Sequence, residues 1–314
     1  MVAEVVNPPS AAPTNRWRRI FIGPNGVRAG WRLLLYIVIV FLIGLLVREL
    51  LKAIMRAGVV SPPPTAATGA FVGPRLQLVL EVAQFIIVVI PALIMAKIER
   101  RPFGRYGLPW ERRGVRQFTI GAVWGIALIS AVIGAIALFH GYDLGRLALA
   151  GPGIAKYALA WLAVFLVVGL FEEFTFRGYT QFTLATGVGF WPAAILLSAA
   201  FGAAHLGNGG EDIVGALQVF LVAMFFCLAL RRTGSLWFAV GAHATFDWGE
   251  TFLYSVPNSG LLATGHLTAA SLHGPAWLTG GTVGPEGSVA CFVAVGLSIA
   301  FFAWLTSGTR AGSI

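Results

Sequence analysis

The chain has 314 residues, of which 57% are hydrophobic and 11% are charged, and its formal net charge is +9. Its mean hydropathy of +0.81 is far above that of a soluble domain of ordinary composition, which predicts an integral membrane protein. The basic residues cluster at the ends of apolar runs, where the positive-inside rule expects them, so the positive charge does not indicate a nucleic-acid-binding protein.

The N-terminal residues 1–30 are polar and contain several prolines and arginines. This composition predicts a flexible basic tail on the cytoplasmic side. The first apolar run is too long for the hydrophobic region of a signal peptide, and no cleavage site directly follows it. We therefore expect a tail at 1–30, a polytopic membrane domain at 31–307 and a short C-terminal tail at 308–314.

The membrane domain contains long apolar runs, each near the ~20 residues that a helix needs to cross the hydrocarbon core. The prediction is an all-α membrane protein, a bundle of about eight transmembrane helices. Proline and glycine mark loops between them at 61–74 and 255–286. The predicted spans are 31–51, 76–97, 118–139, 156–178, 189–206, 212–230, 235–254 and 287–307.

The basic residues also predict an orientation. With eight spans, the N-terminal tail, the 97–116 connection, the Arg231-Arg232 pair and Arg310 all fall on one side of the membrane. The connections at 140–155 and 255–286 are much poorer in lysine and arginine, although the first outer loop is flanked by basic residues. The positive-inside rule then predicts that both termini are cytoplasmic, N-in and C-in.

The fourth predicted span ends in charged residues. An ionised side chain at bilayer depth costs at least ~2.5–3.5 kcal/mol on insertion scales, so a specific reason is needed for Glu172, Glu173 and Arg177. At i and i+4, Glu173 and Arg177 can pair on one helix face, whereas Glu172 lies about 100° away. Glu172 is therefore the leading functional candidate. The alternative is that all three residues form one structural ion-pair cluster.

Two further apolar spans carry polar groups at helical spacing. Phe201 lies one turn before His205, and His243 lies one turn before Asp247. Each has a structural alternative, because a membrane histidine often only bonds a neighbouring helix and Asp247 can simply be the partner of His243. Ionisable residues at bilayer depth usually face the bundle interior, where they can meet.

The spacing of these groups along the helices predicts that they lie at one depth. If the fourth and fifth spans form a hairpin with its turn at 188–189, Glu172 and His205 both lie roughly 20–25 Å from that turn. From the Arg232 end, His243 and Asp247 lie roughly 16 and 22 Å along their helix. All four side chains can therefore share one layer.

Such a layer suits hydrolysis. A glutamate in a low-dielectric cavity can accept a proton from water and return it to a leaving amine, with His205 orienting the same water. His243 and Asp247 would polarise the scissile carbonyl or hold the oxyanion, which requires Asp247 to be protonated or to act through His243. A zinc set of Glu172, His205 and His243 is the competing arrangement. The compact His-Glu-x-x-His element and a cysteine cluster are both missing from the sequence, so no cofactor is predicted.

At these residues the chain resembles the CPBP family of intramembrane proteases, the group that includes the CAAX prenyl endopeptidase and the Abi-like bacteriocin-processing or immunity proteins. The resemblance covers about residues 157–250, with a looser one in the loop before the last span. The family motifs appear here, in order, as Glu172-Glu173-Phe174-Thr175-Phe176-Arg177, Phe201-Gly202-Ala203-Ala204-His205 and His243-Ala244-Thr245-Phe246-Asp247.

The resemblance implies an eight-span all-helical fold and a glutamate-dependent intramembrane endopeptidase. Glu172 and His205 would activate water, His243 and Asp247 would form the oxyanion side, and Glu173, Arg177 and Phe201 would support them. The CAAX-processing branch has asparagine where this chain has Asp247, so cleavage of prenylated peptides does not follow from the resemblance.

The implied substrate is a membrane-associated peptide or protein, and the implied location is a bacterial cell membrane. The alternative function is a non-catalytic membrane protein, either an immunity or scaffold protein or a small transporter that uses the same polar cluster for binding. The sequence gives no oligomeric state.

Overall fold

The structure is a computed structural model that describes residues 20–23, 26–58 and 73–308. Most of the predicted N-terminal tail, nearly all of the predicted 61–74 loop and residues 309–314 of the C-terminal tail lie outside these described residues. The part of the tail that is described forms a short hairpin of β1 (Ile22–Gly23) and β2 (Gly26–Val27) directly before the first long helix.

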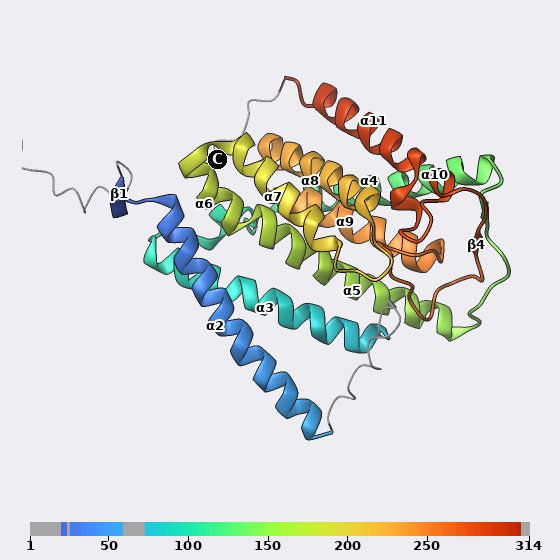
Figure 1. Cartoon of the computed structure of the whole chain (residues 1–314), viewed down its shortest axis with the longest axis horizontal. Helices are drawn as coiled ribbons and strands as arrows, with labels where there is room; N and C mark the ends of the chain where they lie inside the picture. Colours follow the sequence, from blue (N-terminus) through green and yellow to red (C-terminus); the bar gives the residue numbers. More distant parts are fainter. Residues whose placement is uncertain (1–19, 24–25, 59–72, 309–314) are drawn as a thin grey trace, which may run out of the picture.

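The described chain is an all-α bundle, and every predicted span contains a helix (Figure 1). Their ends differ from the predicted bounds by a few residues, because fraying and capping decide where a helix stops. The helices are α2 (Ala29–Arg56), α3 (Pro74–Ile98), α4 (Arg112–Leu138), α5 (Pro152–Arg177), α6 (Tyr179–Val188), α7 (Phe190–His205), α8 (Ile213–Thr233), α9 (Trp237–Trp248) and α11 (Val289–Leu305).

Three local features were not anticipated. The fourth span breaks at Gly178, after which α6 continues to the predicted turn at 188–189. The seventh span ends early as an α-helix and continues as the π-helix η2 (Gly249–Leu253). The predicted 255–286 loop contains β4 (Ser271–Leu272), paired with β3 (Tyr142–Asp143), and the short helix α10 (Ala276–Thr279).

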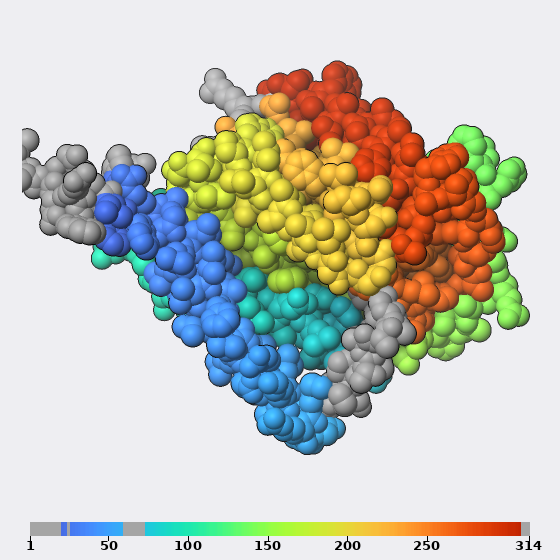
Figure 2. Space-filling model, viewed as in Figure 1, coloured from blue at the N-terminus to red at the C-terminus, as the bar shows by residue number. Residues whose placement is uncertain are grey.

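The composition of the helices makes this a multi-pass membrane protein. Within the described residues, five helical stretches are long and apolar enough to cross a membrane, and α7 and α11 are shorter apolar helices. The α2 helix, which projects from the rest of the molecule in Figure 2, buries little beyond Ala29 and Tyr36. So large an exposed apolar surface is typical of a lipid contact. The N-in, C-in orientation stays a prediction.

The site depends on how four helices pack. The α9 helix lies between α4 and α5, α5 also contacts α3, and α7 packs on α8. The segment from η2 to α11, drawn in orange and red, covers one end of the molecule (Figure 2). This arrangement brings α3, α5, α7 and α9 around one interior space.

The closest of these contacts is between α4 and α9, where glycines allow the two backbones to touch. A Cβ atom added at Gly121 would lie 2.0 Å from the carbonyl oxygen of Phe238, and one at Gly125 would lie 2.1 Å from a backbone oxygen of α9. From α9, Gly241 makes the reciprocal approach at 2.2 Å. Thr245 Oγ1 also donates a hydrogen bond of 2.7 Å to a carbonyl oxygen of α4. Small residues at such crossings stabilise membrane helix pairs through close packing.

We predict that Gly121→Ala separates α4 from α9. The added methyl group has no space, and overpacking of this kind costs about 1–3 kcal/mol. Thermal unfolding in detergent should show the loss. The matched control is Gly134→Ala in the same helix, where an added Cβ meets nothing within 4 Å. Equal unfolding temperatures for the two variants would contradict the close contact.

Candidate active site

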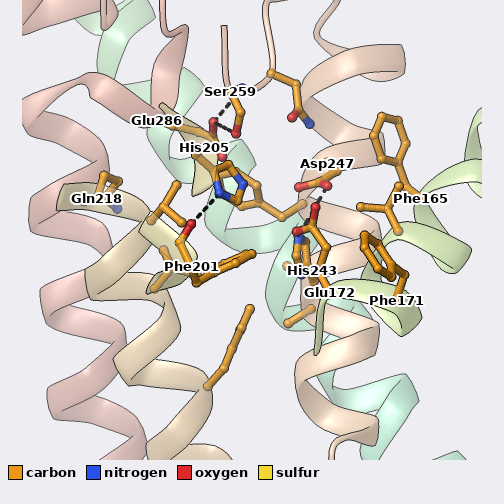
Figure 3. A pocket seen from close by; sticks show the side chains of 18 of the residues that line it. Phe165, Phe171, Glu172, Phe201, His205, Gln218, His243, Asp247, Ser259 and Glu286 are labelled. Carbon is orange, nitrogen blue, oxygen red and sulfur yellow. Dashed lines mark hydrogen bonds and ion pairs between the residues drawn. The ribbon is translucent and has the colours of Figure 1, made fainter. Parts of the chain in front are cut away.

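The four predicted site residues line one cavity of about 290 Å³. Glu172 comes from α5, His205 from the last turn of α7, and His243 and Asp247 from α9. Figure 3 shows Glu172, His243 and Asp247 together on one side of the space, with His205 and Phe201 opposite. The structure therefore brings together side chains that lie far apart in the sequence.

On the first side of the cavity, His243 lies between two carboxylates. Its Nε2 atom is 3.5 Å from Glu172 Oε2 and 3.5 Å from Asp247 Oδ2. The side chain of Glu172 keeps 22% of its surface exposed, against 9% for Asp247. Glu172 is thus the carboxylate of this group that a molecule in the cavity can reach most readily.

On the opposite side, His205 is held by its own helix. Its Nδ1 atom lies 2.9 Å from the carbonyl oxygen of Phe201. A carbonyl can only accept, so Nδ1 carries a proton, and Nε2 of the neutral ring is left as an acceptor. The Phe201 ring packs edge to face on the imidazole at 4.6 Å between centroids. The Phe201 ring therefore lies directly against His205, one helical turn away.

Glu173 lies behind this layer and is fully buried. Its Oε1 atom accepts a hydrogen bond of 2.9 Å from Arg177 Nη1, so the predicted i, i+4 pair is present. The same oxygen is 2.9 Å from His243 Nδ1, a contact that the sequence did not predict. Because Nδ1 donates to Glu173, the ring turns its Nε2 atom toward Glu172 and Asp247.

Arg177 connects the buried pair to the other side of the site. Its side chain is 1% exposed, and its Nε and Nη2 atoms have no hydrogen-bond partner among the described residues. The guanidinium instead lies over the Phe201 ring at 4.7 Å and near the Phe226 ring at 5.8 Å. Cation–π contacts of this kind are favourable when desolvated.

The residues of the alternative zinc set do not form a ligand set. Across residues 20–23, 26–58 and 73–308, no group of three His, Cys, Asp or Glu side chains is arranged to hold a metal ion. His243 Nδ1 is bonded to Glu173, and His205 faces the cavity from the opposite side. Cys227 and Cys291 are free and buried.

Sequence reasoning missed part of the cavity rim. Glu286, in the loop before α11, accepts hydrogen bonds of 2.7 Å from the backbone N–H and 2.8 Å from the hydroxyl of Ser259. This contact joins two parts of the segment that covers the cavity. Nearby, burial and, to a smaller extent, the charge of Glu286 raise the pKa of Glu211 in the α7–α8 loop to about 7. A loop rich in glycine and proline gives no periodic pattern from which these contacts follow.

Glu81 of α3 was missed as well, although its sequence signal was present. Gln77, Glu81 and Gln84 fall at i, i+4 and i+7 of a predicted span, so they share one helix face. All three line the cavity with Glu172. A polar stripe in an apolar helix is itself an indication of a buried site.

Residues 154–249 match the family model described as Type II CAAX prenyl endopeptidase Rce1-like. This chain therefore carries a domain of the Rce1-like type II CAAX prenyl endopeptidase (CPBP) family, which is a peptidase family. The matched segment contains Glu172, His205, His243 and Asp247, whereas Glu81 lies outside it. A search of the curated proteins found no match.

We predict that Arg177→Ala strongly destabilises the protein. Removing one partner of a buried pair leaves an uncompensated charge at a cost of ~3–5 kcal/mol. Folded yield and thermal unfolding in detergent would measure the loss. The control is Arg48→Ala, because Arg48 and Glu49 form an exposed pair, 61% and 55% accessible, and exposed ion pairs contribute little to stability. Wild-type thermostability of the Arg177 variant would refute a structural role.

We also predict that the purified protein holds less than one zinc per chain, because the sequence has neither a cysteine cluster nor a His-Glu-x-x-His element. Elemental analysis of the wild type and of His205→Ala is the measurement. One tightly held zinc per chain that disappears in His205→Ala would replace the scheme below with a Lewis-acid mechanism.

Proposed function

We propose that the protein is an intramembrane endopeptidase that hydrolyses a peptide bond by means of water activated by Glu172 and His205. The observation that carries the proposal is the arrangement of a reachable carboxylate and two imidazoles around one cavity inside an apolar bundle. The family match to residues 154–249 supports a peptidase. In a low-dielectric cavity, a carboxylate becomes a better proton acceptor than in water.

In the proposed reaction, Glu172 takes a proton from water while the oxygen attacks the scissile carbonyl carbon. His205 Nε2 accepts a hydrogen bond from the same water and orients it. Collapse of the tetrahedral intermediate breaks the C–N bond, and the proton held by Glu172 passes to the leaving amine. The products are a carboxylic acid and an amine, which together carry both hydrogens and the oxygen of the water, so protons and electrons balance without a further co-reactant.

His243 is the residue that stabilises the oxyanion of the tetrahedral intermediate in this proposal. With Nδ1 bonded to Glu173, a protonated His243 can donate a hydrogen bond from Nε2 to the developing negative charge. Asp247 supports that ring rather than the oxyanion, since an ionised carboxylate donates nothing. Because His243 supplies the hydrogen bond to the oxyanion, no amide donor is needed at position 247. The chain can therefore have aspartate where the CAAX-processing branch has asparagine. The proposed substrate is a membrane-associated peptide or protein.

We predict that Glu172→Gln folds normally and loses at least ~10²-fold in hydrolysis, because the amide cannot accept the proton. Cleavage of a membrane-peptide library in liposomes and thermal unfolding in detergent would be measured together. The matched control is Glu49→Gln, an exposed glutamate of α2, which should leave both readouts unchanged.

Two outcomes would change the proposal. Wild-type cleavage by Glu172→Gln would remove Glu172 from the mechanism. A wild-type protein that cleaves no member of the library would favour the non-catalytic alternative, in which the polar cluster of an immunity protein, scaffold or transporter only binds.

A further inference from the structure

A second carboxylate, outside the proposed reaction, also faces the cavity. Glu81 of α3 is only 6% exposed, although it lies in a helix that is otherwise strongly apolar. Gln77 donates to its Oε1 atom at 2.7 Å, and Gln84 donates to its Oε2 atom at 3.0 Å. The two amides hold the carboxylate group in place, and all three side chains line the cavity.

Among the described residues, Glu81 and Glu250 are buried glutamates that form no ion pair, and of these two only Glu81 lines the cavity. Glu173 pairs with Arg177, and Glu99 pairs with Arg32. None of the ion pairs formed among the described residues includes Glu81. A buried carboxylate without a compensating charge is costly, so a function is expected to retain it.

Apart from His243, which lies between Glu172 and Asp247, the remaining described residues of the cavity lining supply no side chain that would carry a compensating positive charge. Four acidic residues face it, namely Glu81, Glu172, Asp247 and Glu286, and no lysine or arginine is among the described residues that line it. Glu81 and Glu172 are also close enough to repel each other electrostatically. A cavity whose lining carries more acidic than basic side chains attracts a positively charged ligand.

We propose that Glu81, held by Gln77 and Gln84, binds the ammonium or guanidinium group of a basic side chain in the peptide substrate. This subsite rests on the proposed function, because its occupant is the peptide that Glu172 and His205 would cleave. Glu81 lies on α3, outside the family-matched segment. It would select membrane peptides that carry a lysine or arginine close to the scissile bond.

The test measures binding rather than cleavage. The protein is His205→Ala in lipid nanodiscs, which lacks the proposed water-orienting imidazole and keeps both carboxylates. Fluorescent membrane peptides are made in pairs, which differ only in having lysine or the uncharged norleucine at one position, and this position is moved along the peptide from pair to pair. Energy transfer from the peptide to the labelled protein gives the dissociation constant of each peptide. We expect the lysine peptide to bind about 10-fold more tightly at one position or more.

Adding Glu81→Gln should reduce this preference to about 2-fold or less, because the amide keeps the shape but loses the charge. Glu81→Asp keeps the charge but places it one methylene further from the ligand, so it should give an intermediate preference for the lysine peptide. If Glu81→Gln does not fold, Glu81→Asp still tests the proposal. Glu111→Gln, an exposed carboxylate at the start of α4, is the matched control and should leave the preference intact.

Equal binding of the two peptides, or a lysine preference that survives Glu81→Gln, would overturn the subsite. Repeating the series with and without phosphatidylethanolamine separates a substrate cation from a lipid amine. A preference that disappears only when this lipid is present would assign the subsite to the headgroup and overturn the proposal for the peptide. Because binding is read without cleavage, a wild-type protein that hydrolyses nothing would disprove the proposed function and leave this test valid.

Discussion

The buried carboxylate of Glu173 is the interaction on which the rest of the site depends. One of its oxygens accepts hydrogen bonds from both Arg177 and His243, at 2.9 Å each. In an apolar bundle this charge must be compensated, and the compensation joins α5 to α9. The first bond keeps Arg177 against the Phe201 ring that packs on His205, and the second turns His243 Nε2 toward the cavity. One buried charge thus orients both sides of the site.

The same geometry requires α9 to approach its neighbours closely. Gly121 and Gly125 let the α4 backbone touch α9, the helix that carries His243 and Asp247. The α3 helix contributes to the cavity lining a carboxylate that is held by amides instead of a cation. The cavity therefore has mainly apolar walls, with carboxylates, amides and two histidines among its polar groups.

Local patterns explain what could be predicted from the sequence. The apolar runs give the helices because a backbone in lipid must satisfy its own hydrogen bonds. The i, i+4 spacing predicts the pairing of Glu173 with Arg177, and glycine marks the turn before α7. The break at Gly178 and the π-helix that begins at Gly249 were not predicted, because both depend on how a glycine backbone packs against particular neighbours.

The sequence alone determined the helical membrane class, the order of the polar motifs and the spacing of their side chains, since hydropathy and helical period are properties of short segments. Only the tertiary structure decided that Glu173 contacts His243, that His205 faces Glu172 across a cavity and that Glu81 shares that cavity. These contacts depend on how each helix is rotated about its axis and where it crosses its neighbours. Rotation and crossing are set by side-chain packing between helices, which no single segment encodes.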